Sequence, residues 1–264
     1  MAGSDDVDPR KDAYNRFRKI MTGDVNAAIE GAQSAGADEF LVNDSHDGMR
    51  NILIEELNSN AELISGFTKP HGMMQGIDSS FDLAIFVGYH AMSGAEAAVM
   101  NHTIYPRMVD AVWINDRLVG EAGINAGVAG YFGVPVGLTT GDDKVAQEVT
   151  TLLGPVETAV VKYGIDRFAA RCLPLQQSRD RIRNAAKKAV ERRREFKPLK
   201  HIVPVKFKVR LMSTTPAALA STLSVVKLED PRTVSISAND YLECFRQFLS
   251  VLELAKTAVD EVFG

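Results

Sequence analysis

The chain has 264 residues, of which 45% are hydrophobic and 24% charged. This length suits one large domain or a large domain with a smaller partner, and the composition is that of a globular protein, which excludes global disorder. The formal net charge of −4 argues against a general nucleic-acid binder. No apolar run reaches the roughly 18 residues of a membrane helix. The two cysteines are far apart, which excludes a disulfide scaffold, and the polar N-terminus excludes a signal peptide, so we expect a cytoplasmic protein.

Hydrophobic periodicity predicts strands that alternate with helices along the first 200 residues. In chain order, the expected elements are a helix over 11–35, a strand over 39–44, a helix over 49–57, strands over 62–65 and 83–90, paired extended segments over 104–116, a helix over 120–133, a strand over 134–142, a helix over 143–154, a strand over 156–164 and a basic helix over 174–195. This alternation indicates an α/β fold with a mostly parallel sheet and helices on both faces.

The remaining residues predict a smaller α+β subdomain. It should contain a strand over 205–211, a helix over 213–220, an extended stretch over 233–237 and a long helix from Asn239. We therefore expect an α/β metal-site domain over 1–200 and a C-terminal α+β subdomain over 201–264. The basic run within 174–195 lacks interleaved aromatic residues, so it is interpreted as a solvated face or a subunit contact and not as a nucleic-acid patch.

Two of the five histidines follow predicted buried strands. His46, in NDSH, comes after the strand over 39–44, and His90, in GYH, ends the strand over 83–90. Because the carboxyl ends of parallel strands meet at one edge of a sheet, these imidazoles are candidates for a common site. Two imidazoles and one carboxylate make a typical catalytic zinc set. The alternative is that each histidine only makes hydrogen bonds at the end of its strand.

Glu121 is the candidate carboxylate for such a set. It begins a helix of small residues and is flanked by Gly120 and Gly123, which permit close backbone approach. An acidic residue at this place could equally stabilise the helix N-terminus. His102, in VMNHTIYP, does not end a strand. Beside a metal it could act as an acid, a base or a nucleophile, and otherwise it is a loop residue.

The other polar residues are interpreted as structural. His71 and His201 lie in predicted loops and receive no role. Either Asp44 or Asp47 could orient the imidazole of His46 by accepting its second N–H.

In GDD at 141–143, an aspartate is expected to cap the following helix and not to bind a ligand. The glycines of GINAGVAGYFG match neither GxGxxG after a strand nor GxxxxGK[ST], so a nucleotide-binding enzyme fits only the fold class. No GxSxG motif is present.

Several segments together resemble one family. They are LVNDSHDGMRN, ELISGFTKPHGMMQGID, FVGYHAMSGAEAAVMNHT, WINDRLVGEAGINAGVAGYFGVPVGLTTGDD and AVVKYGIDRFAARCLP. In this order they resemble the DppA-type D-aminopeptidases, a family of zinc metallopeptidases. The resemblance runs from about residue 8 to the C-terminus and is strongest over 38–173.

The resemblance implies an α/β domain with a two-zinc site, a smaller C-terminal domain and a ring-like homo-oligomer, known as a decamer in the family. It implies release of N-terminal D-amino acids, such as D-alanine, from short peptides. By resemblance, His46, His90 and Glu121 are zinc ligands, and His102 takes the place of the proposed catalytic histidine.

The chain departs from the family at its start. The family begins with a strand ending in D-x-E-G, whose two carboxylates bind zinc, whereas MAGSDDVDP corresponds to the segment after that motif. We therefore expect a gap in the sheet with unpaired strand edges, and weakened or single-metal binding. The chain is interpreted as truncated or mis-started. The alternative is an oligomeric binding protein with a damaged metal site.

Overall fold

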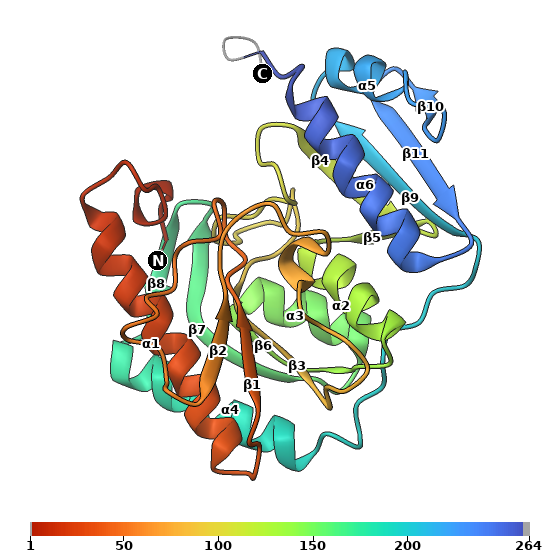
Figure 1. Ribbon diagram of the computed structural model, residues 1–264. Coiled ribbons are helices and arrows are strands. Elements are labelled where there is room, and N and C mark those ends of the chain that lie inside the picture. The colour runs from red at the N-terminus through yellow and green to blue at the C-terminus, as the bar shows by residue number, and fades with distance from the viewer. Residues whose placement is uncertain (1, 261–264) are drawn as a thin grey trace.

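The computed structural model describes residues 2–260 and contains two layered units (Figure 1). The α-helices are α1 (Ala13–Gln33), α2 (Glu121–Tyr131), α3 (Asp143–Leu153), α4 (Leu175–Glu191), α5 (Thr214–Ala220) and α6 (Tyr241–Lys256), with short 3-10 helices η1 (Ser4–Asp6) and η2 (Gly72–Met74). The strands are β1 (Phe40–Asn43), β2 (Ala61–Ile64), β3 (Ala84–Tyr89), β4 (Val109–Ile114), β5 (Arg117–Val119), β6 (Val136–Asp142), β7 (Glu157–Asp166), β8 (Ala169–Cys172), β9 (Val205–Leu211), β10 (Lys227–Asp230) and β11 (Thr233–Ala238).

The first unit is built on a four-stranded sheet with the order β3-β6-β7-β8. Strands β3, β6 and β7 are parallel, and β8 returns antiparallel to β7. Strand β6 is buried along its whole length, as expected for this segment, although it includes Thr139, Thr140 and Asp142. Helices α1 and α4 pack on one face of this sheet, and α2 and α3 on the other. The expected α/β fold with helices on both faces is confirmed, with β8 as an antiparallel edge.

Strands β1 and β2 form a parallel pair that is separate from this sheet. Among the described residues, β3 has β6 as its hydrogen-bonded neighbour and none on its other side. The interruption of the sheet that the sequence predicts is therefore present.

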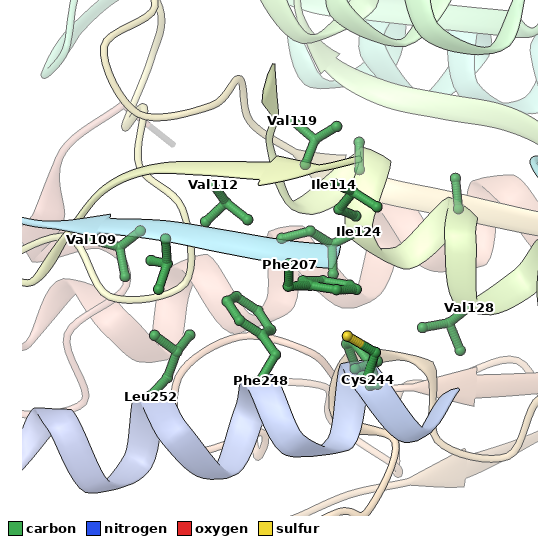
Figure 2. Close-up of a cluster of buried hydrophobic side chains, with 14 of the residues drawn as sticks. Val109, Val112, Ile114, Val119, Ile124, Val128, Phe207, Cys244, Phe248 and Leu252 are labelled. Carbon is green, nitrogen blue, oxygen red and sulfur yellow. The ribbon is translucent and has the colours of Figure 1, made fainter. Parts of the chain in front are cut away.

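The second unit is an antiparallel five-stranded sheet with the order β10-β11-β9-β4-β5. Helix α6 crosses one face, and Phe248 and Leu252 pack from it against Phe207 of β9 and its neighbours (Figure 2). Strands β4 and β5 of this sheet lie before residue 200 in the chain, and β9, β10 and β11 lie after it. The division into domains over 1–200 and 201–264 stays a prediction. The hairpin between β4 and β5 closes, as expected, at Asn115 and Asp116, whose positive φ angles of 46° and 64° suit a two-residue turn.

The expected helix over 49–57 is wrong, because this segment forms only turns. The backbone N–H of Ile52 donates to the carboxylate of Asp44 (2.7 Å), and that of Leu53 donates to Oγ1 of Thr22 on α1 (3.0 Å). These tertiary hydrogen bonds take up the amide groups that a helix would need. Strands β8 and β10 were not expected from the sequence, since most of their residues are exposed and no apolar pattern marks them.

The basic helix α4 is confirmed, and several cations of the basic run over 174–195 pair with acidic neighbours. Arg183 binds Glu30 of α1 at 2.6 Å, and Arg192 binds Glu195 at 2.8 Å. This pairing supports the interpretation as a solvated face. Within residues 2–260, no helix combines the length and apolar character that crossing a membrane requires.

Asp24, between α1 and α4, gives the fold a pH dependence. Its Oδ1 lies 3.8 Å from Nε of Arg179, too far for a hydrogen bond. Burial raises the pKa of Asp24 from 3.8 to about 6 and outweighs the opposing charge of Arg179. A raised carboxyl pKa means that the folded state prefers the protonated form. The contribution of Asp24 to the free energy of unfolding is fully present below pH 3.8 and is lost as the pH rises through about 6.

We expect Asp24→Asn to stabilise the metal-free protein at about pH 8 by about 1–2 kcal/mol and to change its stability little at about pH 3.5, because the amide carries no charge to bury. Urea unfolding at the two pH values measures the difference. Asp38→Asn, at an exposed position, is the control. Equal pH dependence in Asp24→Asn and the parent chain would contradict the assignment.

Candidate functional site

His90, Glu121 and His102 meet at the carboxyl end of β3. His90 follows β3 directly, Glu121 is the first residue of α2, and His102 lies in the loop between β3 and β4. Nε2 of His90 is 3.5 Å from Oε2 of Glu121, and Nε2 of His102 is 3.6 Å from Oε1. The two imidazoles stack with ring centroids 4.0 Å apart. Within the described part of the chain, these three form the group whose ligand atoms all lie within 4.8 Å of one another.

Backbone carbonyl groups fix the orientation of both imidazoles. Nδ1 of His90 is 3.0 Å from the carbonyl oxygen of Ala91, and Nδ1 of His102 is 2.6 Å from that of Met100. A carbonyl oxygen only accepts hydrogen bonds, so each Nδ1 donates its N–H. In the neutral tautomer, the lone pair then lies on Nε2, which in both rings faces Glu121. This is the arrangement that a metal-ligating histidine requires.

The charges of the three groups are coupled. Burial lowers the pKa of His102 to about 4, and the charge of His90 adds to this. Burial also opposes charge on His90, but the charge and hydrogen bond of Glu121 prevail and raise the pKa of His90. Burial would raise the pKa of Glu121, yet the charge and hydrogen bond of His90 lower it to about 2. At neutral pH, the cluster therefore holds an ionised carboxylate next to a neutral His102.

A strained residue helps to hold the carboxylate of Glu121. The backbone N–H of Ile104 donates to Oε1 of Glu121 at 2.7 Å. Ile104 has a φ of 60°, which is rare for a β-branched residue and costs on the order of 1–3 kcal/mol. This hydrogen bond and His102 both engage Oε1, so Oε2 remains the oxygen that faces His90. No sequence signal points to Ile104, since its contribution is a backbone group.

His46 lies beside this cluster but outside the group of three. Burial lowers its pKa, whereas the negative charges of Asp47 and Glu121 raise it and the charge of His90 lowers it further. Its ring also makes a hydrogen bond with the backbone of Val7. The charges of His90 and Glu121 therefore act on His46, and a common site for the two strand-end histidines stays a prediction.

Asp44 supports the His46 loop through the backbone and not through the imidazole. Its carboxylate accepts the side-chain N–H of Asn51 at 2.8 Å, and the same amide group donates to the carbonyl oxygen of His46 at 2.7 Å. Of the two aspartates that flank His46, Asp47 is the one whose charge acts on its imidazole.

Asp142 has the expected capping role and a second one. Its Oδ1 accepts the N–H groups of Lys144 and Val145 at the start of α3, at 3.1 and 2.9 Å. Its Oδ2 accepts the N–H of Val99, at 2.6 Å, in the loop that carries His102. The cap is therefore confirmed, and it also ties this loop to the end of β6.

The other two histidines lie away from the cluster. His71 contacts Phe132 and accepts a hydrogen bond from Arg246 of α6, and His201 stacks on Tyr241 with ring centroids 5.0 Å apart. Both make structural contacts, in agreement with the absence of a predicted role.

The fold and the site together define a class of protein: an α/β protein with a histidine–carboxylate cluster at the carboxyl end of a parallel sheet. A family model described as D-aminopeptidase matches residues 1–250. The chain is 37% identical to a D-aminopeptidase of Bacillus subtilis (strain 168) over 250 residues, which cover 94% of this chain and 90% of that protein. It therefore belongs to the D-aminopeptidase family.

A solved structure shows the same fold. It is described as the zinc-dependent D-aminopeptidase DppA from Bacillus subtilis, a self-compartmentalizing protease. The TM-score is 0.94 and the sequence identity 36%, with 97% of this chain and 93% of that chain covered. The resemblance noted in the sequence is thereby confirmed.

Proposed function

We propose that this chain is a zinc-dependent aminopeptidase that releases N-terminal D-amino acids, such as D-alanine, from short peptides. The observation that carries the proposal is the cluster of the buried Glu121 with the half-buried His90 and His102 in a member of the D-aminopeptidase family. The similar protein of known structure is described as zinc-dependent, which supports the choice of metal.

The donor atoms of the cluster fit a zinc ion. His90 presents Nε2, with Nδ1 held by a carbonyl group, and the carboxylate of Glu121 is ionised and buried, so these two residues would supply two of the ligands. Nitrogen and carboxylate oxygen are ligands that zinc prefers, and three protein ligands with an open position are typical of catalytic sites. Zinc in such a site polarises a scissile carbonyl group and activates water for attack.

We assign His90, Glu121 and His46 as the metal ligands. Oε2 of Glu121 faces His90, whereas Oε1 is already engaged by Ile104, which supports a shared ion between His90 and Oε2. His46 approaches the same cluster and completes the set. Among the described residues, one such group of ligand atoms comes together, so we expect about one zinc per chain.

We assign His102 as the catalytic residue. Its imidazole is neutral at neutral pH, because burial lowers its pKa to about 4, and its Nδ1 is held by Met100. Nε2 can therefore accept a proton from the attacking water and return it to the departing amine, as a general base and then a general acid.

Two alternatives are favoured by particular observations. The ligand atoms of His90, His102 and Glu121 lie closest together, which favours His102 as the third ligand in place of His46. The interrupted sheet beside the site favours a catalytically impaired binding protein of the same fold. We also propose self-association into a homo-oligomer, as suggested by the self-compartmentalizing protein of similar structure. The decamer and the cytoplasmic location stay predictions.

The test compares hydrolysis of a D-alanyl dipeptide and its L-alanyl counterpart by the purified chain. We expect hydrolysis of the D-substrate, loss of the activity on dialysis against a chelator, and recovery on addition of about one equivalent of zinc, because the metal supplies the Lewis acid. Elemental analysis gives the zinc content. Two tightly bound ions per chain would contradict the single-metal assignment, and no hydrolysis with zinc bound would favour the impaired binding protein.

A further inference from the structure

Glu148 of α3 lies between the segments that carry His90 and Glu121. Its Oε2 accepts the backbone N–H of Met92, two residues beyond His90, at 2.8 Å. Its Oε1 lies against Gly120, the residue before Glu121, because a Cβ at position 120 would be only 2.5 Å from it. One side chain thus contacts both of the segments that present ligands.

Gly120, Met92 and Glu148 meet in a closely packed junction. The position that a Cβ of Gly120 would take is also 2.9 Å from Cβ and 3.1 Å from Cα of Met92. Any side chain at position 120 would therefore push these segments apart. The absence of a side chain allows the start of α2 to pack directly on the chain that follows β3. The side chain of Glu148 is the third group in contact at this junction.

The carboxylate of Glu148 is placed where burial opposes its charge. Burial raises the pKa of Glu148, and the N–H of Met92 and the charge of His90 act against this. A hydrogen bond from a backbone N–H to a carboxylate is charge-assisted and stronger than one between neutral groups. The hydrogen bond from Met92 to Glu148 therefore holds the residues that follow β3 against α3.

We propose that Glu148 is a positioning residue, which holds Met92 and thereby His90 at the separation from Glu121 that a divalent cation requires. The inference rests on the proposed metal centre and goes beyond it, because Glu148 itself is not a ligand. Removing a group that orients metal ligands typically weakens metal binding about 10–100-fold.

The experiment measures zinc affinity by competition with a chromophoric chelator. We expect Glu148→Ala to bind zinc about 10–100-fold more weakly than the parent chain, whereas Glu148→Gln, whose amide oxygen can still accept from Met92, stays within about threefold. Glu148→Asp keeps the charge but is too short to reach Met92, so we expect it to bind as weakly as the alanine variant. Gln147→Ala, at an exposed position on the same helix, is the matched control.

Thermal unfolding of each metal-free variant shows whether it is folded, and the aspartate and glutamine variants carry the test if the alanine variant is not. The positioning role would be overturned if Glu148→Asp bound zinc as tightly as the parent chain. It would also be overturned if Glu148→Gln and Glu148→Asp lost zinc affinity equally. In both cases the proposed function would stand. A parent chain that binds no zinc would overturn both.

Discussion

Replacing Glu121 with glutamine is expected to remove zinc binding and peptidase activity together. The amide oxygen can still accept the N–H of Ile104, so the side chain keeps its place. The group that faces His90 becomes an NH₂, which carries no charge and cannot bind a cation. Because metal assistance supplies several kcal/mol to hydrolysis, we expect kcat/KM to fall on the order of 10³-fold or more.

Metal content by elemental analysis and kcat/KM on a D-alanyl dipeptide are the two measurements. Glu96→Gln, at an exposed position in the loop between β3 and β4, is the control for loss of a carboxylate in this region. Thermal unfolding of the metal-free proteins shows whether Glu121→Gln is folded. A glutamine variant that retains a full complement of zinc would remove Glu121 from the ligand set.

Apolar patterning predicts those parts of the fold that local sequence determines. The buried strand over 134–142 and the helix indicated by the three- and four-residue spacing within 11–35 are both predicted from the sequence, and the structure contains them as β6 and α1. The segment over 49–57 has a helical pattern but is not a helix, because Asp44 and Thr22 bind its amide groups from distant parts of the chain. Such competition depends on tertiary contacts that a periodic pattern does not contain.

In the candidate site too, some residues can be predicted from local sequence, whereas others depend on tertiary contacts. The strand-end argument predicts that His46 and His90 share a site, because the carboxyl ends of parallel strands meet at one edge of a sheet. Among the described residues, however, β1 and β3 belong to separate sheets. The residues alone leave His102 either a loop histidine or an acid, base or nucleophile beside a metal, and the family resemblance favours the second role. The supporting groups cannot be predicted locally. Ile104 contributes a strained backbone N–H, and Glu148 reaches Met92 from 56 residues further along the chain.

The roles of His46 and His102 are separated by replacing each with alanine. If His46 is a ligand, we expect His46→Ala to lose zinc affinity by at least about tenfold and to lose activity at zinc concentrations that saturate the parent chain. If His102 transfers protons, we expect His102→Ala to keep its zinc, while kcat falls about 10²–10⁴-fold and KM changes little. His201→Ala, which lies outside the cluster, controls for loss of an imidazole.

The opposite pattern is equally informative, because the two imidazoles differ in what else holds them. His102 stacks on His90 with ring centroids 4.0 Å apart and shares Glu121 with it, whereas His46 interacts with the cluster through longer-range charge. Zinc lost in His102→Ala and retained in His46→Ala would therefore establish the donor set of His90, His102 and Glu121. The proton transfer would then fall to a group other than His102, and the neutral imidazole of His46 would be the next candidate to test for it.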